Sequence, residues 1–145
     1  MSKDNECRHE RLLEVARAWQ RRRFRWGGAD CVIFGLETTR AMTGRDLSIP
    51  VAEGYATRVE ADEVLRRHAG GDLEYAVQDF CARHAMPEIP VTRAGRGDLV
   101  IYDIESRRGP VKNLGVCMGA TIAAPSRAGL AHLPLTVARR AWRVA

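Results

Sequence analysis

One of the four cysteines in this 145-residue chain lies where a nucleophile could be positioned for chemistry. Cys31 directly follows the segment WGGAD and begins the apolar stretch CVIFGLETTRAMTG, which is typical of a buried helix. The first N–H groups of a helix lack partners and carry partial positive charge, so they would stabilise a thiolate. Gly27 and Gly28 would let a substrate backbone approach the thiol closely. From these residues alone, Cys31 is either a nucleophile for acyl transfer or an inert buried thiol.

Four helices are expected to position this cysteine. Apolar residues at helical spacing predict the first helix over about Asp4 to Arg23. Capping residues predict where the other three begin: Asp30, the Thr57–Glu60 capping box, and Asp72. Their ends are expected at Gly44, Gly70–Gly71 and Met86–Pro87, with a loop through Pro50 to Gly54 after the second helix.

After Gly97 the apolar pattern changes to that of strands. The segments GDLVIYDI, NLGVCMG, ATIAA and GLAHLPL are predicted strands, and ESRRGPVK is predicted to be a polar connection between the first two. The last segment, VARRAWRVA, is interpreted as a short helix running into a final strand. Helices over about 4–86 followed by a small, mostly antiparallel sheet over about 91–145 predict a single α+β domain spanning residues 1–145.

Three segments resemble the NlpC-type cell-wall cysteine peptidases. FRWGGADCVIFGLE is similar to their nucleophile segment, and RGDLVIYD is similar to an Arg-Gly-Asp-Leu landmark that opens their next strand. NLGVCMG is similar to the strand whose first position carries their catalytic histidine. The resemblance spans Phe24 to Ala124. It implies a papain-like, NlpC-type fold in which Cys31 takes the nucleophile position.

A narrower resemblance concerns the pairs Thr43–Gly44 and Gly54–Tyr55 and the terminal AWRV. Together they resemble a small family from the tail regions of phages and prophages, which is similar to the peptidases in fold. This resemblance implies a component of tail or tail-tip assembly whose partners are other phage tail proteins. Such a protein would be made in the cytoplasm and then join the virion tail.

The chain departs from the peptidase pattern at the general base. Asn113 occupies the histidine position, and an amide cannot take a proton from a thiol near neutral pH. The third polar position of the triad falls at about Ala123. His9, His68 and His84 are expected on helices, so His132 in GLAHLPL is the alternative base, although the resemblance places its strand beyond the histidine strand.

Two functions therefore follow from the resemblance. The first is an assembly protein with lost or impaired hydrolase activity. The alternative is an active cysteine peptidase that cleaves peptidoglycan peptides during phage DNA entry, with Cys31 as nucleophile and Asn113 or His132 completing the site. Loss of a general acid–base group would remove about 10²–10⁴-fold of the rate.

Composition excludes several other classes of protein. The sequence contains no CxxC pair, HExxH, phosphate loop or dinucleotide fingerprint, so we expect no metal and no cofactor. It has no apolar run long enough to span a bilayer and no apolar core of a secretory signal near Met1, so we expect reduced cysteines and no membrane span.

A nucleic-acid partner is also disfavoured, although the net charge is +5 with 21 Arg against 2 Lys. Seven arginines lie between Arg8 and Arg25, among the aromatic residues Trp19, Phe24 and Trp26. Three glutamates share the same predicted helix, so we interpret the stripe as a solvated helix face.

Overall fold

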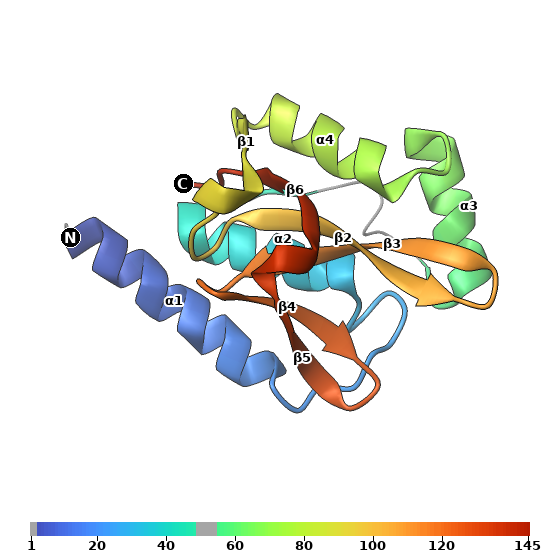
Figure 1. Ribbon diagram of the computed structural model, residues 1–145, viewed down its shortest axis with the longest axis horizontal. Helices are drawn as coiled ribbons and strands as arrows, with labels where there is room; N and C mark the ends of the chain where they lie inside the picture. Colours follow the sequence, from blue (N-terminus) through green and yellow to red (C-terminus); the bar gives the residue numbers. More distant parts are fainter. Residues whose placement is uncertain (1–2, 49–54) are drawn as a thin grey trace.

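The computed structural model describes residues 3–48 and 55–145, and within them four helices accompany one antiparallel sheet of six strands (Figure 1). The helices are α1 (Lys3–Trp19), α2 (Cys31–Thr43), α3 (Arg58–Ala69) and α4 (Leu73–Arg83). The strands are β1 (Glu88–Ile89), β2 (Leu99–Ser106), β3 (Gly109–Cys117), β4 (Thr121–Ser126), β5 (Gly129–Pro134) and β6 (Ala138–Trp142), in the sheet order β1-β6-β2-β3-β4-β5. The predicted α+β class is confirmed.

The predicted caps of α2, α3 and α4 are confirmed. The side chains of Asp30, Thr57 and Asp72 accept backbone N–H bonds from the first turns of these helices. Gly44 and Gly70 end α2 and α3 in the left-handed conformation, which a glycine adopts without strain.

The predicted end of the first helix at Arg23 is wrong, because α1 ends at Trp19. The residues after it run beside the β4–β5 hairpin, where the Phe24 N–H donates to the Ser126 carbonyl at 2.9 Å. These strand contacts replace the helical bonds that the periodicity predicted. Cys7 lies inside α1.

The strand boundaries also differ from those predicted. ESRRGPVK is not a connection: only Arg107 and Arg108 form the turn, and β3 begins at Gly109. The final strand expected in VARRAWRVA is confirmed as β6, but the short helix expected before it is wrong, because only the 3-10 turn Leu135–Val137 precedes the strand. The sheet also gains β1, which pairs with β6. The loop expected through Pro50 to Gly54 lies outside the described residues.

The main core lies between one face of the sheet and the helices α1, α2 and α4. It is built from large apolar side chains that include Trp19, Phe34, Phe80, Ile101 and Val116. A second, smaller core lies on the other face of the sheet and contains Val100, Tyr102, Cys117, Ile122 and Ala141. None of the helices within the described residues has both the length and the apolar character that crossing a membrane would need.

Candidate functional site

A groove of about 640 Å³ opens at the start of α2, and Cys31 lies in its lining. We call it the Cys31 groove. It is lined by Phe24, Trp26, residues 30–32, Tyr55, the residues of α3 that face it, residues 70–73 and residues 110–113. The segments before α2, around α3 and along β3 therefore meet here, although they are far apart in the sequence.

Cys31 has surroundings that keep its thiol protonated. Burial among protein atoms is the largest influence and, together with the negative charge of Asp30, raises the pKa of Cys31 to about 11. Backbone N–H groups of Leu114, Cys31 and Val32 act in the opposite direction and do not outweigh burial. The N–H groups at the start of the helix do lower the pKa, as expected, but desolvation of the thiolate costs more than the helix end contributes, so the pKa is raised overall.

Asp30 holds together the turn that carries Cys31. It is 1 % exposed, and its carboxylate accepts three hydrogen bonds: from the Tyr55 hydroxyl at 2.6 Å, and from the backbone N–H groups of Gly27 and Ile33 at 2.9 Å. Burial, followed by this hydrogen bond to Asp30, raises the pKa of Tyr55. Because the Asp30 carboxylate already accepts these three hydrogen bonds, it does not serve as a base for the Cys31 thiol.

Gly27 allows that turn to approach Tyr55. Its φ is +72°, and a Cβ at this position would lie 1.8 Å from the Tyr55 backbone oxygen. The glycine is thus required for close contact within the protein itself, between the segment before α2 and the segment before α3.

Asn113 lines the Cys31 groove, and its amide is bonded within its own strand. Its Nδ2 donates to the Val111 carbonyl at 3.2 Å. Leu114 belongs to the core that packs against α2. Because neighbouring side chains of a strand point to opposite faces, the side chain of Asn113 lies on the other face of β3. It is the backbone of Leu114 that meets the Cys31 thiol.

None of the four histidines, all of which lie in the described part of the chain, lines the Cys31 groove. His132 lies on β5 opposite Ala123, and β4 separates it from β3. His84 follows α4, where Arg45 contacts its backbone carbonyl and its ring. His9 and His68 lie on α1 and α3. The structure thus brings Cys31 and Asn113 to one groove and leaves His132 outside it.

A proline explains why the sheet opens beside Cys31. Strands β3 and β4 pair at Val116–Ala123 and Cys117–Ile122. The same register would place Pro125 opposite Leu114, and proline has no N–H to donate to the ladder. The two hairpins β2–β3 and β4–β5 diverge from this point (Figure 1), and the start of α2 lies near where they separate.

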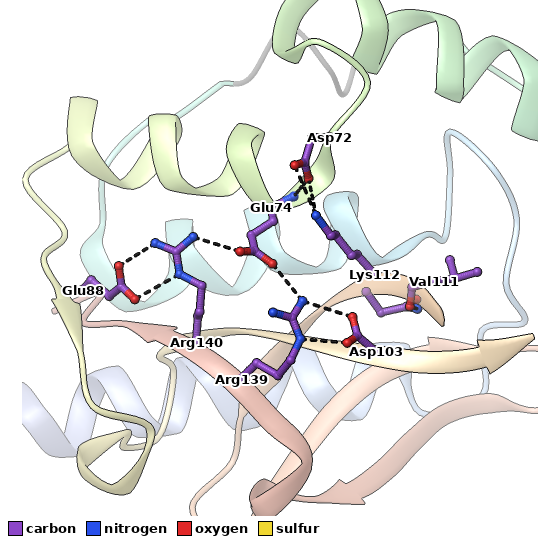
Figure 2. Close-up of polar contacts among 9 residues, drawn as sticks. Asp72, Glu74, Glu88, Asp103, Val111, Lys112, Arg139 and Arg140 are labelled. Atoms are coloured by element: carbon purple, nitrogen blue, oxygen red, sulfur yellow. Dashed lines mark hydrogen bonds and ion pairs between the residues drawn. The ribbon is translucent and has the colours of Figure 1, made fainter. Parts of the chain in front are cut away.

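Ion pairs join the other end of the groove to the sheet. Lys112 on β3 donates to both carboxylate oxygens of Asp72, at 3.0 and 3.2 Å, and both residues line the groove. Just behind this pair, Glu74 accepts hydrogen bonds from Arg139 at 2.8 Å and Arg140 at 3.1 Å. Figure 2 shows how each arginine also reaches a second carboxylate, that of Asp103 or Glu88. These bonds fix the start of α4 against β2, β3 and β6.

Tyr55, Lys112 and the backbone of Leu114 are parts of the site that were not predicted from the sequence. Tyr55 and Lys112 lie in segments that were expected to be connecting chain. Pro125 was the available signal for the open strand edge at Leu114, because a proline within an apolar run indicates an interrupted strand edge. Within residues 3–48 and 55–145, no group of three or more His, Cys, Asp or Glu side chains could hold a metal ion.

Comparison with known proteins gives a family and no function. Residues 5–144 match the family described as "Domain of unknown function (DUF6950)", and the chain belongs to that family. No curated protein and no solved structure matches the chain.

Proposed function

We propose that this member of the DUF6950 family is a phage or prophage tail-associated protein with an NlpC-like, papain-like fold. It would serve tail or tail-tip assembly by holding a segment of a partner protein in the Cys31 groove without hydrolysing it. The tail context rests on the sequence resemblance, whereas the absence of hydrolysis rests on the groove itself.

The observation that carries the proposal is a cysteine in a groove that none of the chain's histidines lines. A thiol with a pKa of about 11 is ionised in about one molecule in 10⁴ at pH 7. Attack by the thiolate would need a base to take the proton and an acid to give it to the leaving amine. Asn113 supplies neither, and His132 lies on another strand.

An active cysteine peptidase acting on peptidoglycan peptides is the second candidate. It is favoured by the backbone N–H groups of Leu114, Cys31 and Val32 around the thiol. N–H groups in such positions can stabilise the oxyanion that forms when a carbonyl is attacked. The two candidates differ in whether the thiol ionises near neutral pH.

Alkylation of Cys31 by iodoacetamide, followed by mass spectrometry of the digested protein, distinguishes the two candidates. Cys7 is exposed and serves as an internal reference for the reagent in the same sample. We expect Cys31 to react more slowly than Cys7 at pH 7, and its rate to rise with pH up to about 11. A Cys31 rate that is high and already constant below pH 7 would contradict the proposal and favour the peptidase.

Complementation tests the biological part of the proposal. A prophage that carries the gene should lose infective tails when the gene is deleted. Both the wild-type gene and a Cys31→Ser gene should restore them, because the proposed role uses the groove and not the thiolate. Restoration by wild type alone would indicate that thiol chemistry is required, and normal tails after deletion would exclude the assembly role.

A further inference from the structure

The strand β3 has one edge that faces the Cys31 groove. Backbone N–H groups of successive residues in a strand point to opposite sides. The Cys117 N–H donates to the Asp98 carbonyl, towards β2, whereas the Met118 N–H donates to the Thr121 carbonyl, towards β4. The same alternation directs the backbone groups of Leu114 and Lys112 away from β2. The backbone of Leu114 contacts the Cys31 thiol, which agrees with backbone groups that point away from β2.

Lys112 therefore offers an N–H and a carbonyl on the groove side of β3. Within residues 3–48 and 55–145, β4 pairs with this edge of β3 at Val116 and Cys117 but not at the residues before them. In that earlier part of the edge, the backbone of Leu114 contacts the Cys31 thiol. Residues 110–113 all line the groove, so the edge is part of its wall. A sheet edge with free donors and acceptors is a template on which another extended chain can pair.

The remaining walls fit an extended polypeptide. Phe24 and Trp26 form an edge-to-face aromatic pair with ring centroids 4.8 Å apart, and both line the groove. Val32 and Leu73 line the groove and also a small apolar void of about 30 Å³ between α2, α4 and the sheet. A chain paired with β3 would thus meet apolar and aromatic surface with its side chains.

The charges of the groove favour a peptide over a nucleic acid. The cations that line it are Lys112 and Arg58, and each lies beside a carboxylate, Asp72 at 3.0 Å and Asp62 at 3.9 Å. A strand of nucleic acid needs cations that are free to pair with phosphates. The two ion pairs balance, and the other carboxylate in the lining, that of Asp30, is buried and hydrogen-bonded, so the groove suits a segment with little net charge.

We infer that the Cys31 groove binds its partner as an added β-strand, with an extended, weakly charged peptide segment pairing with the Lys112 edge of β3 and placing an apolar side chain over Val32 and Leu73. The inference rests on the proposed peptide-holding function and names the class of ligand. Pairing of β3 with β4 stops before Pro125, so the backbone groups of Lys112 remain available for main-chain hydrogen bonds with the added strand. Cys31 lies at the inner end of that strand.

A peptide mixture tests this inference on the full chain. Acetylated, amidated peptides of random sequence, about six residues long to match an ordinary strand, are passed over the immobilised protein. Retained peptides are sequenced by mass spectrometry, synthesised, and synthesised again with one backbone amide at a time N-methylated. Strand pairing predicts that methylation at alternate residues weakens binding by about fivefold to tenfold, while methylation at the residues between has little effect.

Two variants of the same residue provide the matched control. Lys112→Ala and Lys112→Pro both remove the ion pair with Asp72, but only Lys112→Pro removes the N–H that faces the groove. We expect Lys112→Pro to bind the selected peptides about fivefold to tenfold more weakly than Lys112→Ala. Circular dichroism checks that both variants fold. Binding of the N-methylated peptides is measured on the wild-type protein, so that test holds even if a variant does not fold.

The outcomes of these experiments distinguish strand addition from the peptide-holding function on which it rests. Alternating sensitivity to N-methylation with a weaker Lys112→Pro variant supports strand addition. Peptides that bind both variants equally, with no alternation, overturn strand addition and leave a peptide-holding groove intact. Retention of no peptide overturns both the inference and the peptide-holding function on which it rests.

Discussion

The two ends of the Cys31 groove are built on different physical principles. At the inner end, Asp30 is 1 % exposed and accepts three hydrogen bonds that hold the turn before α2. At the outer end, the side chains of Lys112 and Asp72 form an ion pair while each remains about two-fifths exposed, at 41 % and 44 %. Removing a buried, hydrogen-bonded charge leaves its partners unsatisfied, whereas an exposed pair is easily replaced by water. The inner end should thus be rigid and intolerant of change, and the outer end adaptable.

The largest expected effect is at the inner end. Asp30→Ala removes the N-cap of α2 and leaves the Tyr55 hydroxyl and the Gly27 N–H without their acceptor. We expect a loss of about 3–5 kcal/mol in the free energy of unfolding, measured by urea denaturation. Asp72→Ala, which removes the exposed N-cap of α4, is the matched control and should cost about 1–2 kcal/mol. Equal losses would contradict the contrast between the two ends.

An intermediate effect is expected just behind the outer end. Hydrogen bonds from Arg139, opposed by burial and aided by Arg140, lower the pKa of Glu74 in the folded protein. A lowered pKa means that the contribution to stability is complete above the unfolded pKa of about 4.3 and is lost as the pH falls through the folded value. Glu74→Gln should therefore cost about 1–2 kcal/mol at pH 7.

The difference between wild type and Glu74→Gln should shrink as the pH falls below about 4, because Glu74 in the wild type is then protonated as well. Urea denaturation of both proteins in steps from pH 7 downwards measures this difference. A difference in unfolding free energy that stays constant across that range would show that the Arg139 and Arg140 bonds do not depend on the Glu74 charge.

The smallest effect is expected at the exposed pair itself. Lys112→Ala should lower the free energy of unfolding by about 0.2–1 kcal/mol, the usual range for an exposed ion pair. The loss should nearly disappear in about 1 M NaCl, where the screening length is about 3 Å. Urea denaturation at low and high salt provides the test. A loss that is larger than this range and unaffected by salt would mean that Lys112 contributes by packing.

Local features of the fold could be predicted from the sequence. The caps Asp30, Thr57 and Asp72 depend on bonds between residues two or three positions apart, so their pattern is visible in the chain itself. The position of Cys31 at the start of α2 follows from the first of them. The helices could be predicted for the same reason, and the strands from the change of apolar pattern after Gly97.

Features that depend on distant partners could not be predicted. Arg21 to Arg25 continue a helical pattern, but the helix ends before them and the Phe24 N–H donates to the β4–β5 hairpin instead of to the preceding turn. ESRRGPVK has the polarity of a loop, but most of it forms strand because all of its residues except Arg107 and Arg108 pair across the hairpin. The lowering effect of the N–H groups at the start of α2 on the pKa of Cys31 could be predicted, but the burial that raises this pKa overall could not, because the groove around the thiol is assembled from segments remote in sequence.

The free edge of β3 also bears on how the protein avoids self-association. An unpaired strand edge on an open surface invites a second sheet to dock and extend it indefinitely. Here the edge lies inside a groove with α3 on one side and Phe24 and Trp26 among the other walls, so a single extended chain can enter but a folded sheet cannot approach. Pro110 and Lys112 lie on the same strand, and these residue types are common on edges that resist aggregation. We therefore expect the molecule to remain free of fibrillar assembly through this edge.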